Sequence, residues 1–279
     1  MGFRIVMDSC GELTDEMKRD SRFVSVPLTL RVGDMEFVDD DSFNQQECLR
    51  RMDESEECPR SACPSPEKYM EIFLDGAERY YVVTLSGHLS GSYNSARLGM
   101  EMAVEQKPEL QIHIFDSRSA SIGETLTAAH LLECEERGMD FLETVKDTER
   151  YIRGRKTFFV LENLDVLRKN GRLGNLKSLV ASALKIRPIL GATAEGEICQ
   201  LSQARGIRKA LERMVEFITE QVKDSEHRIL AISHCNCLDR AQKVKEALLK
   251  KMKVRDVLLV NTGGVSTMYA NDGGIIVAI

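Results

Sequence analysis

The chain has 279 residues, of which 43% are hydrophobic and 29% charged, and its formal net charge is −6. This composition is ordinary for a folded globular protein and argues against long disordered regions. The negative charge and the absence of Trp argue against a general nucleic acid binder, because both a basic field and stacking platforms are lacking. The N-terminus lacks a signal-peptide pattern and no apolar run reaches about 18 residues, so we expect a cytoplasmic protein without an integral membrane segment.

Short apolar runs predict strands along the whole chain. Several are nearly continuous in Val, Ile and Leu, which is typical of strands buried on both faces of a parallel sheet. In chain order, the predicted strands are Phe3–Met7, Phe23–Val26, Tyr80–Leu85, Ile112–Phe115, Thr157–Leu161, Ile229–Ile232 and Val257–Val260.

Helical patterns lie between these strands, over residues 66–77, 92–105, 122–137, 139–153, 205–222 and 238–250. The first begins at Pro66, a favoured first helical position, and the stretch 205–222 has one apolar stripe at helical spacing. The alternation predicts an α/β fold with largely parallel sheets flanked by helices. The basic, Gly-containing stretch 151–157 predicts a junction between an N-terminal α/β domain, 1–155, and a C-terminal α/β domain, 156–279.

Two acidic stretches, 39–41 and 53–58, are predicted to be solvated loops. The eight cysteines are expected to be free thiols in a chain without a signal peptide. The stretch His234–Cys237 resembles half a metal site, but no second ligand pair has zinc spacing. We therefore predict no metal site.

The segment 80–96 has the richest potential for chemistry. Its predicted strand enters a turn rich in Ser and Gly, and a helix follows. Free backbone N–H groups at the helix start, together with the hydroxyls of Ser86, Ser90 and Ser92, suit a carboxylate or phosphate. Plain capping of the helix by Ser90 or Ser92 explains the same pattern equally well.

A serine hydrolase is an alternative for this segment, with Ser90 or Ser86 as nucleophile. However, Ser90 lies one position late for the G-x-S-x-G pattern in the stretch 87–91, and a neighbouring His88 does not by itself make a triad. Nucleotide binding has little support, because no Walker A spacing occurs and no G-x-G-x-x-G follows the first strand.

Three further positions are candidates for binding. Ser61 precedes a loop stiffened by prolines and could present its hydroxyl, or could simply belong to a capping turn. Arg172 follows a tight Asn-Gly turn and could meet an anionic group or a partner. Arg205 lies at a predicted helix start, where it could line a cleft or form scaffold salt bridges, and we predict that it faces a partner or a phosphate.

Taken together and in this order, these pieces resemble the DegV family over the full length of the chain. The stretches that carry the resemblance are Met7-Asp8-Ser9, Ser61-Ala62-Cys63-Pro64-Ser65-Pro66, Leu89-Ser90-Gly91-Ser92-Tyr93-Asn94-Ser95-Ala96, Phe115-Asp116-Ser117, Ser121-Ile122-Gly123, Leu167-Arg168-Lys169-Asn170-Gly171-Arg172-Leu173 and Arg187-Pro188-Ile189-Leu190.

The resemblance implies a two-domain, non-catalytic bacterial protein without a cofactor. Such a protein binds one long-chain fatty acid, such as palmitate or oleate, in a cleft between or beside the domains. It implies a role in lipid transport or fatty acid metabolism. The bound acid would be presented to a partner fatty acid kinase, whose acyl phosphate product feeds phospholipid synthesis.

The resemblance also assigns residues. Ser61 and Ser90 would hold the carboxylate, with Gly91 supplying a backbone donor, and Arg172 would face the kinase or a phosphate. Ser61 replaces the usual Thr and keeps the hydroxyl.

The sequence departs from the family pattern near its end, where Tyr269 stands at the usual His and Asn271-Asp272-Gly273 replaces Gly-Pro-Gly. A phenol can still donate a hydrogen bond to a carboxylate but cannot be cationic. Three hypotheses therefore remain from the sequence: a lipid carrier or kinase subunit, a serine hydrolase, and a scaffold that has lost its ligand.

Overall fold

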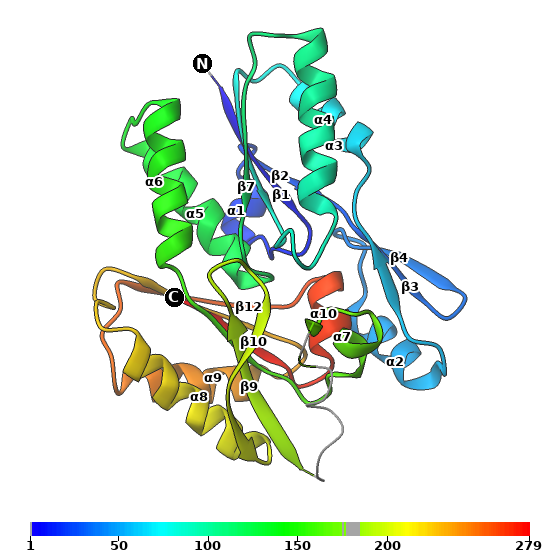
Figure 1. Ribbon diagram of the computed structural model, residues 1–279, viewed down its shortest axis with the longest axis vertical. Coiled ribbons are helices and arrows are strands. Elements are labelled where there is room, and N and C mark those ends of the chain that lie inside the picture. The colour runs from blue at the N-terminus through cyan, green and yellow to red at the C-terminus, as the bar shows by residue number, and fades with distance from the viewer. Residues whose placement is uncertain (1, 175, 177–184) are drawn as a thin grey trace.

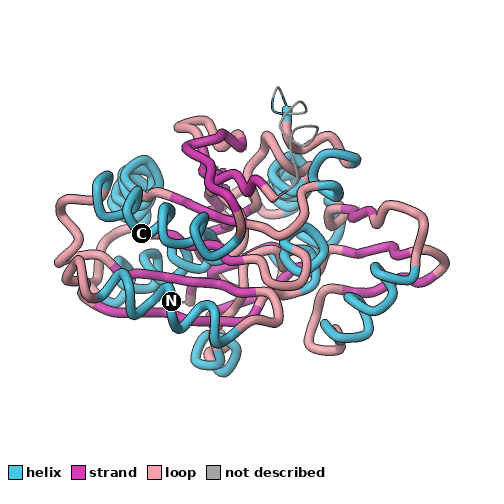
Figure 2. The backbone as a smooth tube through the Cα atoms, turned by 90° about the horizontal axis from the view of Figure 1, so that it is seen from below, coloured by secondary structure: helices cyan, strands magenta, loops and turns pink. Residues whose placement is uncertain are grey.

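The computed structural model describes residues 2–174, 176 and 185–279. Two large sheets lie one above the other in Figure 1, each with helices packed against it, and a small sheet projects to one side. Figure 2 shows the same small sheet set apart from the two larger ones. None of the helices in the described residues is long and apolar enough to cross a membrane.

The first sheet is fully parallel, with strand order β2-β1-β6-β7. Its strands are β1 (Phe3–Asp8), β2 (Phe23–Val26), β6 (Arg79–Thr84) and β7 (Gln111–Asp116). Strands β1 and β6 are apolar on both faces, as predicted, because helices cover both sides of the sheet. On one side lie α3 (Pro66–Phe73) and α4 (Ser92–Gln106); on the other lie α1 (Asp15–Arg19), α5 (Ile122–Glu136) and α6 (Phe141–Gly154).

Helices α3 and α4 approach each other closely at Gly99. A Cβ atom at Gly99 would lie 2.6 Å from the carbonyl oxygen of Pro66 and 2.7 Å from the Cβ of Tyr69. Glycine therefore sets how near the two helices can pack.

The second sheet has strand order β10-β9-β8-β13-β11-β12. Its strands are β8 (Thr157–Val160), β9 (Ile186–Ala192), β10 (Ile198–Arg205), β11 (Ile229–His234), β12 (Asp256–Asn261) and β13 (Ile275–Ala278). Helices α8 (Ile207–Gln221) and α9 (Leu238–Leu249) bury their apolar faces against it. A short helix, α7 (Asp165–Lys169), follows β8.

The predicted α/β class is confirmed, but the prediction of largely parallel strands is wrong for this second sheet. Only β11 and β12 pair in parallel, and the other neighbours are antiparallel. Parallel neighbours need a long crossover. Strands β9 and β10 are instead joined by a short turn, and β13 enters between β8 and β11 running against both.

The small sheet is antiparallel, with strand order β4-β3-β5. It consists of β3 (Thr29–Val32), β4 (Met35–Val38) and β5 (Arg60–Ala62), and α2 (Gln45–Glu54) packs beside β3. The sequence did not predict these elements. The prediction of solvated loops was wrong in part, because residues 53 and 54 belong to α2 and Asp39 is only 5% exposed.

Asp39 is buried because it joins the small sheet to α10 (Gly264–Ala270). Its carboxylate accepts hydrogen bonds from the backbone N–H groups of Gly264 and Val265 and from the Ser9 hydroxyl. Three donors satisfy a buried carboxylate that would otherwise be costly to desolvate.

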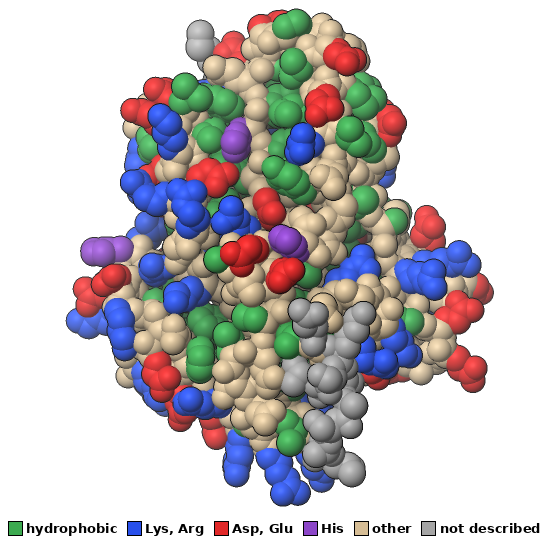
Figure 3. Space-filling model, viewed as in Figure 1, with side chains coloured by type: hydrophobic (Ala, Val, Ile, Leu, Met, Phe, Trp, Pro, Cys, Tyr) green, Lys and Arg blue, Asp and Glu red, His purple; other side chains and the backbone are tan. Residues whose placement is uncertain are grey.

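The strands of the first sheet come from residues before 117, and those of the second from residues after 156. This arrangement supports the division into domains 1–155 and 156–279, which stays a prediction. The face shown in Figure 3 carries both acidic and basic side chains, with several Lys and Arg side chains gathered at its lower edge.

Candidate functional site

A pocket lies between the two large sheets. It contains about 740 Å³ of space not filled by atoms, a figure that includes open solvent at its mouth. The loops after β1, β6 and β7 supply one side, and β8, β9, β10, β13, α7 and α10 supply the other. The parallel strands of the first sheet all end toward this pocket, where ligands of open α/β sheets commonly bind.

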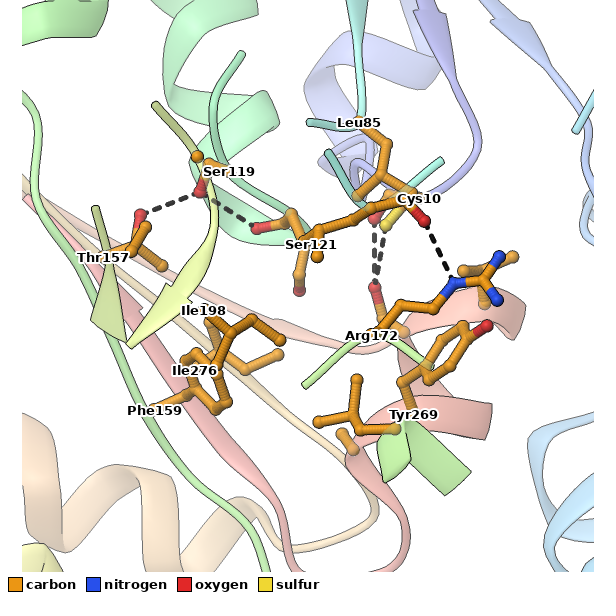
Figure 4. A pocket seen from close by; sticks show the side chains of 18 of the residues that line it. Cys10, Leu85, Ser119, Ser121, Thr157, Phe159, Arg172, Ile198, Tyr269 and Ile276 are labelled. Atoms are coloured by element: carbon orange, nitrogen blue, oxygen red, sulfur yellow. Dashed lines mark hydrogen bonds between the residues drawn. The ribbon is translucent and has the colours of Figure 1, made fainter. Parts of the chain in front are cut away.

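Most of the pocket wall is hydrocarbon. Leu85 faces the pocket from the first sheet, and Phe159, Ile198 and Ile276 face it from the second (Figure 4). Leu161 and Leu167 extend this wall. Such a surface offers a long apolar ligand contact without competing hydrogen bonds.

The polar end of the pocket is formed by Arg172 and Tyr269, whose side chains lie beside each other in Figure 4. The Nε of Arg172 donates to the carbonyl oxygen of Leu89 at 3.1 Å. The phenol oxygen of Tyr269 lies 3.3 Å from the hydroxyl oxygen of Ser61. This end therefore combines a cation with hydroxyl donors, a set that suits a carboxylate.

Ser90 and Gly91 stand next to this polar end. The Ser90 hydroxyl oxygen lies 3.1 Å from that of Ser92 and accepts the Ser92 backbone N–H at 3.2 Å, just before the N-cap Gly91 of α4. The loop after Ser61 touches the same place, since a Cβ at Gly91 would lie 3.1 Å from the Cys63 sulfur. The structure thus gathers the Ser61 segment and the Ser90 loop beside the polar end, although Ser61, Ser90 and Gly91 do not themselves line the pocket.

Arg205 is placed elsewhere. It is exposed at the end of β10, seven residues beyond the pocket-lining Ile198, which in an extended strand is roughly 20 Å away. Arg205 therefore does not belong to the pocket, and its role toward a partner or phosphate stays a prediction.

The serine hydrolase arrangement is not assembled in the part of the chain described here. The Ser86 hydroxyl is buried and donates to the carbonyl oxygen of Gly196 at 2.8 Å. The half-exposed His88 ring lies 3.6 Å from the Glu197 carboxylate, and the hydroxyl of Ser90 pairs with Ser92. The Ser86 hydroxyl oxygen accepts only the backbone N–H of His88, and among the described residues neither serine is hydrogen-bonded to a histidine ring, which a base-activated nucleophile requires.

Buried carboxylates behind the pocket wall form a feature that sequence reasoning missed. The carboxylate of Glu12 accepts the Ser121 hydroxyl at 2.8 Å, and that hydroxyl lies 2.7 Å from the hydroxyl of Ser233 on β11. Burial raises the pKa of Glu12 to about 7 and that of Asp39 to about 6. Burial also raises the pKa of Asp8 and of Glu124. No local pattern signals this group, because Asp8, Glu12 and Glu124 meet only when α5 packs against β1.

Comparison with known proteins agrees with this geometry. The family model described as "Uncharacterised protein, DegV family" matches residues 2–279. A DegV domain-containing protein of Streptococcus pneumoniae is 34% identical over 257 residues, which cover 92% of this chain and 90% of that protein.

Two solved structures are similar over the whole chain. The DegV family protein of Ruminococcus gnavus, crystallised with vaccenic acid, is 51% identical with a TM-score of 0.97, and the match covers 100% of this chain and 99% of that one. The Fatty Acid Kinase (Fak) B3 protein of Streptococcus pneumoniae, loaded with linoleic acid, is 31% identical with a TM-score of 0.89 and the same coverage. The chain described here belongs to the DegV family.

Proposed function

We propose that this protein binds one long-chain fatty acid in the pocket between its two large sheets. The observation that carries the proposal is a mostly hydrocarbon wall with the positive charge of Arg172 and the phenol of Tyr269 at one end. The hydroxyls of Ser119, Ser121 and Thr157 also line the pocket, but they are hydrogen-bonded within the protein. Two family members of similar structure hold fatty acids of this class, vaccenic and linoleic acid. The tail lies along Phe159 and Ile276, and the carboxylate lies at the polar end.

The energetics suit such a ligand. Burying a sixteen-carbon tail contributes on the order of 12 kcal/mol at roughly 0.8 kcal/mol per methylene, before the cost of association is subtracted. The carboxylate must be met by donors, because an unpaired buried charge is expensive. Ser61, Ser90, the Gly91 N–H and the Tyr269 phenol supply neutral donors, and Arg172 supplies the positive charge that a phenol at position 269 lacks.

The protein acts without catalysing a reaction of its own. It presents the fatty acid to a partner kinase, which forms an acyl phosphate for phospholipid synthesis. The similarity to the Fak B3 protein supports this role. Gly91 and Cys63 beside the polar end are exposed, so a partner can approach this end of the pocket. The cytoplasmic location and the partner-facing role of Arg205 belong to this proposal as predictions.

The test is mass spectrometry of the ligand released when the purified protein is denatured, together with titration by palmitate and oleate. We expect one long-chain fatty acid per chain. The double substitution Ser61→Ala and Ser90→Ala should weaken retention, whereas the exposed pair Ser25→Ala and Ser42→Ala should not.

Two outcomes contradict the proposal. A protein that carries no fatty acid and binds neither palmitate nor oleate would be the scaffold without a ligand. Turnover of an acyl ester that disappears in Ser90→Ala would instead establish the hydrolase.

A further inference from the structure

Three potential metal ligands meet between α5 and α6, on the side of the first sheet that α1 also covers. His130 and Cys134 stand one turn apart on α5, and Asp147 faces them from α6. The His130 Nε2 is 2.9 Å from the Asp147 Oδ2 and 3.5 Å from the Cys134 Sγ. The Cys134 Sγ is 3.8 Å from the same Asp147 oxygen.

These distances are close to those of a tetrahedral zinc site. Bonds of about 2.0 Å to nitrogen or oxygen and about 2.3 Å to sulfur place neighbouring ligand atoms about 3.3–3.6 Å apart. The observed separations of 2.9, 3.5 and 3.8 Å need shifts of only about half an ångström. The arrangement does not suit a nucleophile with its base, because Asp147 and Cys134 both approach the same ring nitrogen and Cys134 is fully buried.

The surroundings fix the ligands in place. The His130 ring stacks on Tyr151 with centroids 4.1 Å apart and an interplanar angle of 5°. The other oxygen of Asp147 is held by Arg150, so Oδ2 is the oxygen turned toward the cluster. Such outer partners orient the ligands of metal sites.

The chemical states of the three groups are also compatible with a metal. Burial lowers the pKa of His130. Burial alone would raise the pKa of Asp147, but the contacts with His130 and Arg150 together lower it. Burial raises the pKa of the Cys134 thiol to about 11, so the metal must displace that proton on binding.

An open cavity beside the cluster contains about 1210 Å³ of space not filled by atoms, open solvent included, and is lined by His130, Asp147, Glu133, Arg137 and Arg255 among others. Glu133 pairs with Arg137 and Arg255, so water is the fourth ligand that this cavity supplies. We propose that His130, Cys134 and Asp147 form a tetrahedral site for a divalent ion of the zinc type, whose fourth position opens to this cavity. The site would clamp α5 to α6 independently of the fatty acid.

The test is titration of chelator-treated, full-length protein with Co²⁺, which reports a thiolate ligand as a near-ultraviolet charge-transfer band and tetrahedral geometry as intense visible bands. We expect one Co²⁺ per chain, displaced by one Zn²⁺. The charge-transfer band should vanish in Cys134→Ser, and Asp147→Asn should weaken binding at least tenfold. The paired substitution Cys235→Ser and Cys237→Ser, in the other stretch rich in Cys and His, should leave both bands unchanged.

Each variant is compared by circular dichroism before metal is added, so that a lost band is read only from folded protein. Wild-type protein should also gain thermal stability with Zn²⁺, and the half-buried Asp147→Asn variant should not. Wild-type protein without tetrahedral bands, or bands that survive Cys134→Ser, would overturn the site.

Discussion

Tyr269 is the residue whose chemistry the structure clarifies most. Its phenol contacts the Ser61 hydroxyl and shares the polar end of the pocket with Arg172. A histidine at this position could itself carry positive charge. Here the neighbouring Arg172 is always charged. The Tyr269 phenol therefore needs only to orient the ligand carboxylate by donating a hydrogen bond to it.

The substitution Tyr269→Phe should therefore reduce fatty acid affinity about five- to tenfold, since a hydrogen bond contributes about 1 kcal/mol. Displacement of a fluorescent fatty acid measures the change. Tyr80→Phe removes a phenol that donates to Asp75 at 2.7 Å on the first sheet, and it is the matched control. Equal affinity in wild-type protein and Tyr269→Phe would place the carboxylate elsewhere.

Single residues were predictable only where a local pattern or the family resemblance pointed to them. Ser90 and Arg172 stand in recognisable turns, and Ser61, expected in a loop, lies on the short strand β5; the structure brings the three segments together. Asp39 stands in an acidic run that reads as solvent-exposed. Its burial depends on the N–H groups of Gly264 and Val265, more than 200 positions away in the chain, and no local pattern contains that information.

At the scale of elements, α3 and α4 connect the scaffold to the pocket. The Ser61 loop leads into α3, and the Ser90 loop leads into α4. The close contact at Gly99 therefore sets the separation of the two loops that are proposed to hold the carboxylate.

The substitution Gly99→Ala should destabilise the protein by about 1–3 kcal/mol. Its methyl group would clash with the Pro66 carbonyl oxygen and the Tyr69 Cβ, which are fixed to the backbone and cannot move aside like the end of a flexible side chain. It should also weaken fatty acid binding by spreading the two loops. Urea unfolding and ligand titration measure the two effects. Gly154→Ala adds a methyl group where no atom lies within 4 Å, and it should leave stability nearly unchanged.

Elements with a strong local signal were predicted well. The apolar runs of β1 and β6 and the long helices α4 and α8 match their predicted ranges within a few residues. Strands β3 and β4 carry charged residues such as Arg31 and Glu36, and β13 has only four residues. Such short or polar strands are defined by their partners, which sequence periodicity does not reveal.

At the scale of the whole molecule, Glu12 and Asp39 link the first part of the chain to the second. Glu12 reaches Ser233 through the Ser121 hydroxyl, and Asp39 holds the start of α10. Burial raises their pKa values to about 7 and about 6, from 4.5 and 3.8. The folded protein thus retains protons that the unfolded chain has already released in this range.

Because the folded state binds more protons, the free energy of unfolding should fall as pH rises from about 4 to about 7. We expect urea unfolding to show greater stability at pH 5 than at pH 8, with a contribution on the order of 3 kcal/mol from Glu12. Glu12→Gln should flatten this dependence, whereas Glu16→Gln, which removes an exposed carboxylate on α1, should not. A stability that rises steadily over this range in wild-type protein would contradict the assignment.

The pocket and the cluster around His130 both belong to this largest scale. The spacing of His130 and Cys134 is visible in the sequence, but Asp147 joins them only because α5 and α6 pack together. The pocket likewise takes its walls from both sheets. The sequence indicated strands of both sheets and the loops between them. The pocket and the His130 cluster arise only when these elements pack together.

The central position of β13 has a consequence for how the chain is made. Strand β13 is synthesised after β8, β9, β10, β11 and β12, yet it lies between β8 and β11. Until it emerges from the ribosome, β8 and β11 each present an unpaired edge. Such edges promote association between nascent chains, so the interval before β13 is released is when we expect this protein to depend most on chaperones.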